Sequence, residues 1–201
     1  MKLKCSHARS VAVLRERPDR AGPATTEFAA RISSMRNPAE RVYVLLMKTS
    51  NFRIVPLPTE VANTARQAAT AAAPDHAVIT ADLPTGYPCR HCLRWAKVGE
   101  HVILFPYASI APGRPYSESG PIFVHAEPCE RYGATEQYPA DFRGSRVLRA
   151  YNSNDDMIDA AVVSDNNPEP VIERLLQNPE TAFLQARSVT RGCYTFRIER
   201  A

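Results

Sequence analysis

Two cysteines stand two residues apart in the stretch YPCRHCL, and a histidine and a third cysteine follow later in the chain. Cys89 and Cys92 form a C-x2-C pair, and after a spacer of 32 residues His125 and Cys129 form an H-x3-C pair. Thiolate sulfur and imidazole nitrogen are ligands that zinc prefers, and two chelating pairs complete a tetrahedron. The pattern therefore predicts a zinc site, provided that the chain brings the two pairs together.

Two residues beside these pairs differ from the usual zinc knuckle. Leu93 stands after the second cysteine, where such knuckles have glycine or another small residue, and Pro128 rather than a turn-forming glycine precedes Cys129. The alternative to a metal site is a set of unliganded cysteines that pack as small hydrophobic side chains.

The same residues also allow cysteine chemistry without a metal. Cys89 could act as a nucleophile, with His125 as its base and Glu100 or Glu118 orienting the imidazole. A thioredoxin-like redox couple of Cys89 and Cys92 would need a helix that begins at the first cysteine. The stretch LRWAK is barely one helical turn long before Gly99, so this helix is not predicted. The simpler hypothesis for His125 is a hydrogen-bonded histidine at the end of a strand.

A second polar segment, PGRPYSESGP, precedes the strand that carries the histidine. It places a cation, a phenol, hydroxyls and a carboxylate within six residues, and loops held by a rigid sheet often bind ligands. A solvated turn is the alternative. The residues predicted to bind a small polar ligand are Arg90, Arg114, Tyr116, Glu118 and Ser119.

The elements that must position these residues follow from periodicity and turn signals. We expect Thr59 to cap the first helix, whose apolar face comprises Val61, Ala65, Ala68, Ala69 and Ala72, and Asn167 to cap the second. Consecutive strands with only two helices indicate an α+β fold, a single domain with a mostly antiparallel or mixed sheet. Strands are predicted at 51–57, 76–83, 99–107, 120–127, 145–151, 157–163, 181–189 and 193–200, and helices at 59–72 and 169–177.

The pairing of two of these strands carries a prediction about the site. Strands 99–107 and 120–127 are consecutive in the chain, and consecutive strands usually pair antiparallel when a loop joins them. This pairing would place the start of the first strand beside the end of the second. We therefore expect His125 to approach Glu100 and the end of the CRHCL stretch.

Charge divides the chain into two parts. Residues 1–46 hold nine Lys/Arg and four Asp/Glu, a net of +5, whereas residues 47–201 hold sixteen and seventeen, a net of −1. We interpret residues 1–46 as a basic, disordered arm and residues 47–201 as one domain. Because the domain has no basic excess, a nucleic-acid partner is not expected.

Hydropathy and cysteine usage indicate where the protein resides. No apolar run approaches the roughly 18 residues that span a bilayer, and no apolar region of a secretory signal follows the basic start. We expect a cytoplasmic protein with no membrane partner. Five cysteines, an odd number, favour metal binding, catalysis or burial over a disulfide framework.

Six stretches of the sequence also carry a resemblance: FRIVPLP, YPCRHCL, VGEHVILFPY, PYSESGPIFVHAEPC, VLRAY and RGCYTFRIER. With them the chain resembles domain-of-unknown-function family 1203, a group of small bacterial proteins. The resemblance implies one compact domain that begins near Met47, and it transfers no established activity. The family pattern does not require a cysteine at position 92, which would limit a four-ligand site to some members. The positions that it favours for a shared role are Cys89, Arg90, Glu100, Tyr116, Ser119 and Gly120.

Two classes of function remain open. A small binding domain for a metal or a polar ligand near YPCRHCL and PYSESGP is favoured, because the chain lacks signatures such as G-x-S-x-G, H-E-x-x-H or a phosphate-binding glycine loop. The alternatives are a cysteine-dependent enzyme that uses Cys89, and a structural or interaction protein with no site.

Overall fold

The computed structural model describes residues 51–201, which belong to a compact unit spanning Thr49–Ala201. The basic arm expected over residues 1–46 lies outside the described residues. None of the described helices is long and apolar enough to cross a membrane. The elements are β1 (Phe52–Val55), α3 (Thr59–Thr70), β2 (Ala77–Thr80), β3 (His101–Ala108), β4 (Ser119–His125), the 3₁₀ helix η1 (Ala140–Phe142), β5 (Arg146–Tyr151), β6 (Met157–Val163), α4 (Glu169–Gln177), β7 (Phe183–Ser188) and β8 (Tyr194–Arg200).

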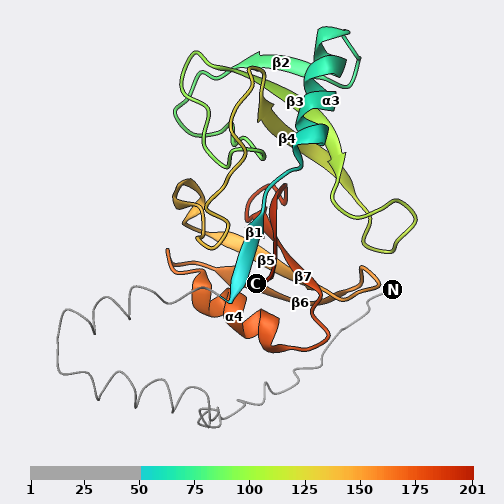
Figure 1. Cartoon of the computed structure of the whole chain (residues 1–201), viewed down its shortest axis with the longest axis vertical. Coiled ribbons are helices and arrows are strands. Elements are labelled where there is room, and N and C mark those ends of the chain that lie inside the picture. The colour runs from blue at the N-terminus through green and yellow to red at the C-terminus, as the bar shows by residue number, and fades with distance from the viewer. Residues whose placement is uncertain (1–50) are drawn as a thin grey trace, which may run out of the picture. The chain divides into compact units, whose positions relative to one another are not determined.

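The strands form two antiparallel sheets rather than the single sheet expected from the sequence (Figure 1). The larger sheet has the order β1-β8-β7-β5-β6, and the smaller has the order β2-β3-β4. Every pair of neighbouring strands is antiparallel. The α+β class is therefore confirmed, with one helix associated with each sheet (Figure 1).

The core of the five-stranded sheet lies between its strands and α4. The helix buries Ile172, Leu175 and Leu176 on one face, as its apolar spacing predicts. These side chains share a hydrophobic cluster with Leu148 of β5 and Phe196 of β8. Pro168 rather than the expected Asn167 occupies the N-cap position, and no side chain caps the helix.

The core of the three-stranded sheet lies under α3. Ala62 and Ala65 are the buried residues of this helix, and only Ala65 of these belongs to the predicted apolar face. Ala72 is exposed and lies beyond the end of the helix. Small side chains allow the helix to lie close to β3, where Ile103 is buried. Thr59 does not cap the helix, because the N-cap residue is Pro58 and the Thr59 hydroxyl contacts a histidine of the YPCRHCL segment instead.

Candidate metal centre

The YPCRHCL segment folds into a tight hairpin between β2 and β3. The backbone N–H of Cys89 donates to the carbonyl of Arg94 at 2.9 Å, and that of Leu93 donates back to the carbonyl of Cys89 at 3.0 Å. Leu93 has a φ of 53°, a left-handed conformation that glycine adopts more readily. The chain therefore makes a knuckle-like turn without the usual glycine, and both cysteine side chains are buried.

Strand β4 holds this turn in place. The N–H of Arg90 donates to the carbonyl of Phe123 at 2.9 Å, and Cys89 forms a parallel bridge with Phe123. His125 is two residues further along the same strand, opposite Val102 in the register of β3 and β4. The predicted antiparallel pairing is confirmed, and it places the end of β4 beside the two cysteines.

The two sequence pairs meet as one cluster. The ligand atoms of Cys89, Cys92, His125 and Cys129 all lie within 4.8 Å of one another, although 32 residues separate the pairs. Sγ of Cys89 is 3.9 Å from Sγ of Cys129, and Sγ of Cys92 is 3.4 Å from Nδ1 of His125. Zinc bonds of about 2.0–2.3 Å in a tetrahedron separate the ligand atoms by roughly 3.5–3.8 Å. These two separations are close to that range, and no two of the four ligand atoms are more than 4.8 Å apart.

The histidine of the cluster has its second nitrogen paired with a carboxylate. Nε2 of His125 lies 3.4 Å from Oε2 of Glu100, while Nδ1 faces the sulfur of Cys92. A histidine that binds metal through one nitrogen usually donates its other N–H to such a partner, which fixes the ring and its tautomer. The expected approach of His125 to Glu100 is confirmed, in an arrangement that suits ligation through Nδ1.

Hydrogen-bond donors surround the sulfur atoms. His91 lies 3.3 Å from Sγ of Cys129 through Nδ1, and its Nε2 is 3.0 Å from the hydroxyl of Thr59. Nη2 of Arg66 is 3.7 Å from the same sulfur, and its Nε donates to the carbonyl of His125 at 3.1 Å. Such contacts orient ligands and stabilise negative charge on sulfur. Sequence reasoning missed these contacts of Arg66 and Thr59, because helix periodicity does not indicate which side chains reach residues 32 to 63 positions further along the chain.

Titration of the cluster follows from these contacts. Hydrogen bonds with Cys129 and then Cys92 lower the pKa of the Cys89 thiol. Hydrogen bonds with Cys89 and then Cys92 raise the pKa of the Cys129 thiol. Burial lowers the pKa of His91, so this imidazole is neutral near pH 7 and donates through one nitrogen only. Contact with Cys92 raises the pKa of Arg94, which therefore keeps its positive charge beside the sulfur atoms.

Comparison with known proteins identifies the group to which this domain belongs. The model of the family described as "Protein of unknown function (DUF1203)" matches residues 86–200, more than half of the chain. The chain belongs to the DUF1203 family. No curated protein and no solved structure gave a significant match.

The DUF1203 match contains all four residues of the cluster, together with Glu100 and His91. It starts at residue 86, just before the hairpin, whereas the sequence resemblance was expected to extend back to about Met47. Helix α3, which supplies Arg66 and Thr59, lies outside the matched range. All four proposed ligands thus lie within the residues that the DUF1203 model matches, whereas the α3 side chains that contact them or their neighbours lie outside those residues.

The residues predicted to bind a polar ligand do not gather beside the cysteines. Arg114 pairs with Asp155 at 3.9 Å, and the ring of Tyr116 packs edge-on against Tyr151. Arg90 is buried and turns toward β8, where its Nε donates to the carbonyl of Tyr194 at 2.9 Å. In this DUF1203 protein, Glu118 and Ser119 line a cavity without any residue of YPCRHCL, and Pro121 alone of the PYSESGP segment lines the cavity that contains Arg90.

Glu118 is not the residue that orients His125. Its carboxylate forms ion pairs with Arg149, at 3.3 Å, and with Arg187. Ser119 lines the same small cavity of about 160 Å³ as these three side chains. Glu100 alone of the two predicted carboxylates contacts the imidazole. Of the two predicted alternatives Glu100 is thus the one at the imidazole, because the loop that carries Glu118 turns toward β5 and β7.

The geometry around Cys89 weighs against a free nucleophile or a thioredoxin-like couple. Its side chain is 0% exposed, and a nucleophilic thiolate must be accessible to a substrate. Among the described residues, the nearest contact of His125 Nδ1 is with Cys92 rather than Cys89. The segment 89–96 contains no helix, so no helix dipole acts on the first cysteine. The arrangement favours ligation over covalent chemistry.

Proposed function

We propose that the chain is a structural zinc-binding domain, with one Zn²⁺ held by Cys89, Cys92, His125 and Cys129. The observation that carries the proposal is the convergence of four ligand atoms within 4.8 Å of one another. Three sulfur atoms and one imidazole nitrogen form a donor set that selects zinc over magnesium or calcium, which prefer oxygen. Four protein ligands complete a tetrahedron, and a closed site of this kind is typical of structural rather than catalytic zinc.

The charges around the cluster support the same assignment. Three thiolates and one Zn²⁺ sum to −1, and a buried negative charge needs compensation. Arg66 and Arg94 lie against the sulfur atoms of Cys129 and Cys92 respectively. Backbone N–H groups of Cys92 and His125 also point to the sulfur of Cys89. Without a cation, several thiols would instead have to retain their protons in a buried site.

The position of the hairpin indicates what the zinc would stabilise. Arg90 joins the hairpin to β8 through the Tyr194 carbonyl, and Leu93 is buried in the core of the five-stranded sheet. The carbonyl of His91 accepts from the N–H of Tyr132 at 3.0 Å. One metal ion would thus fix a segment that contacts both sheets. We propose that its role is to hold this segment in place.

Metal analysis of the purified protein tests the proposal. Native mass spectrometry of protein prepared without chelators should show one zinc per chain. Cys92→Ser should lose that zinc, because one of the four ligands is removed. Cys193→Ser is the matched control, since Cys193 lies outside the cluster, and this variant should keep one zinc per chain.

Cobalt substitution separates loss of the site from loss of the fold. Protein stripped with a chelator and loaded with Co²⁺ should show the visible absorption of a tetrahedral thiolate site, at one equivalent per chain. Wild-type protein that carries no zinc and takes up neither Zn²⁺ nor Co²⁺ would contradict the proposal. Equal loss of zinc in the Cys92 and Cys193 variants would contradict the assigned ligands.

A further inference from the structure

A separate cavity of about 560 Å³ is lined by three arginines and by none of the four cluster residues. Arg90 comes from the hairpin, Arg146 from the start of β5, and Arg191 from the turn between β7 and β8. The residues that line it include no aspartate or glutamate. Within residues 51–201, none of the three guanidinium groups forms an ion pair. The cavity therefore carries an uncompensated positive charge.

Arg90 is held rigidly and keeps one edge of its guanidinium unused. Its side chain is buried, with Nε bonded to the carbonyl of Tyr194 at 2.9 Å and Nη1 to that of Pro88 at 2.5 Å. The guanidinium carbon lies 6.0 Å from the centre of the Phe123 ring. Among the described residues, Nη2 has no hydrogen-bond partner, so its two N–H groups are available to a ligand.

Arg146 also lies against an aromatic ring and also has a guanidinium nitrogen without a hydrogen-bond partner. Its guanidinium carbon lies 5.7 Å from the centre of the Phe142 ring, and Nη1 donates to the carbonyl of Ser145 at 2.8 Å. Nε is buried and has no hydrogen-bond partner. A buried donor without an acceptor is destabilising, and more so when it is charged. Such an atom beside a cavity indicates a missing acceptor.

The electrostatic cost points in the same direction. Burial lowers the pKa of Arg146, because a guanidinium that leaves water without a carboxylate partner is destabilised. An anion in the cavity would offset this cost. Planar N–H edges held against aromatic rings are well suited to bind phosphate or carboxylate oxygens.

We propose that this cavity binds a small phosphorylated molecule, a phosphate monoester with an apolar or planar body. Three guanidinium groups match a dianionic phosphate better than a single carboxylate, which one bidentate arginine satisfies. The hydroxyl groups of Ser188 and Thr195 add neutral donors along the same wall. The volume falls within the range of small-molecule sites, about 300–1,000 Å³, and leaves room beyond the phosphate.

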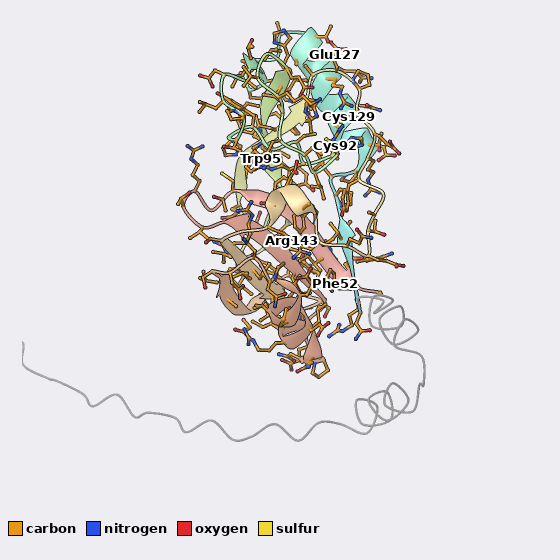
Figure 2. All side chains as sticks on the ribbon, turned by 90° about the vertical axis from the view of Figure 1, so that its left-hand side faces the viewer. Phe52, Cys92, Trp95, Glu127, Cys129 and Arg143 are labelled. Atoms are coloured by element: carbon orange, nitrogen blue, oxygen red, sulfur yellow. The ribbon has the colours of Figure 1, made fainter. Side chains whose placement is uncertain are left out.

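Apolar and aromatic side chains line much of the cavity. Trp95, Phe123 and Phe142 line the cavity together with Leu104 and Pro121 (Figure 2 labels Trp95). Trp95 is stacked on Phe142, with ring centres 5.5 Å apart. A ligand with a ring or an apolar chain next to its phosphate would contact this surface. Of the five residues predicted from sequence to bind a polar ligand, Arg90 alone lines this cavity.

Binding of defined anions to the full chain tests the proposal. Isothermal titration calorimetry should show saturable binding of phenyl phosphate, tighter than that of inorganic phosphate, which lacks a ring, and tighter than that of benzoate, which carries one charge. Arg191→Gln and Arg146→Gln should each weaken phenyl phosphate binding about tenfold, as loss of one charge-assisted contact implies. Arg174→Gln, an exposed arginine of α4, is the matched control and should change nothing.

The variants also provide the outcomes that would overturn the proposal. Arg191 is exposed in a turn, so its replacement should leave the fold intact even if that of Arg146 does not. Failure of phenyl phosphate to saturate, or an unchanged affinity in Arg191→Gln, would overturn the assigned cavity. Equal or tighter binding of benzoate would overturn the phosphate assignment. Tighter binding of a single-stranded oligonucleotide would replace the small molecule with a nucleic acid.

Discussion

Leu93 carries a conformational cost that its side chain offsets. Its φ of 53° allows the hairpin to close around the cysteines, and its side chain is 2% exposed within the larger core. A left-handed conformation costs an L-residue roughly 1–2 kcal/mol, whereas burial of a leucine contributes about 1.5–3 kcal/mol. The turn therefore keeps leucine where glycine would fit the backbone more easily.

This balance predicts an unusual order of stability for two substitutions. Leu93→Ala loses the buried side chain and keeps the backbone strain, while Leu93→Gly loses both. We expect both variants to be destabilised, with Leu93→Gly more stable than Leu93→Ala by roughly 1 kcal/mol. The free energy of unfolding from urea titration measures the difference.

Leu148 is the matched control for this comparison. It is fully buried in β5, in the same cluster as Leu93, and its φ is not positive. There the usual order should hold, with the glycine variant less stable than the alanine variant by about 0.5–1 kcal/mol. The same order at both positions would mean that backbone strain at Leu93 is negligible.

At the scale of elements, the antiparallel pairing of β3 with β4 explains why the ligand set could be predicted. Strands that follow each other in the chain usually pair, so the proximity of Glu100 and His125 could be inferred from order alone. The C-x2-C and H-x3-C spacings supplied the rest of the cluster. Local patterns sufficed because each ligand pair lies within one turn or one strand end.

Long-range pairings could not be predicted in this way. β1 pairs with β8 at the other end of the described chain. It therefore belongs to the larger sheet, while β2, β3 and β4, which follow it in the sequence, form a separate sheet. The contact of Arg66 with Cys129 and the turn of Glu118 toward Arg187 depend on the same tertiary arrangement. Hydrophobic periodicity specifies which face of a strand is buried, and it does not specify a distant partner.

Glu118 provides a test of how the loop before β4 is anchored to β7. Arg187 is 3% exposed, and besides Glu118 it contacts Gln185 at 2.6 Å and the carbonyl of Gly192 at 3.0 Å. Removing the carboxylate leaves a buried guanidinium without its counter-charge. Because Glu118 itself is 47% exposed, we expect Glu118→Gln to cost about 1–2 kcal/mol, or roughly 2–8 °C in Tm.

An exposed pair serves as the comparison. Arg174 and Asp159 lie 3.7 Å apart with side chains 56% and 48% exposed. Surface pairs of this kind contribute about 0–1 kcal/mol, so Arg174→Gln should shift Tm by no more than about 4 °C. Equal shifts in the two variants would show that burial of Arg187 does not strengthen its pairing with Glu118.

At the scale of the whole described domain, two hydrophobic cores differ in how much they depend on the proposed metal. The core of the five-stranded sheet comprises 15 buried residues, of which only Leu93 belongs to the hairpin. The core of the three-stranded sheet comprises 10, and two of these are Cys89 and Cys92. Loss of the ion should therefore loosen the smaller sheet far more than the larger one.

Hydrogen exchange measured by mass spectrometry can resolve this difference. After zinc is removed with a chelator, we expect amides of β3 and β4, such as those of Ile103 and Val124, to exchange at least about tenfold faster. Amides of β7 and β8, such as those of Leu184 and Ile198, should retain most of their protection, because proteins open in separate cooperative units and this core lacks the ligands. Restoring zinc should restore protection in β3 and β4. Equal loss of protection in both sheets would mean that the hairpin couples them into one cooperative unit, and no loss in either would show that the cluster does not need a metal to hold the fold.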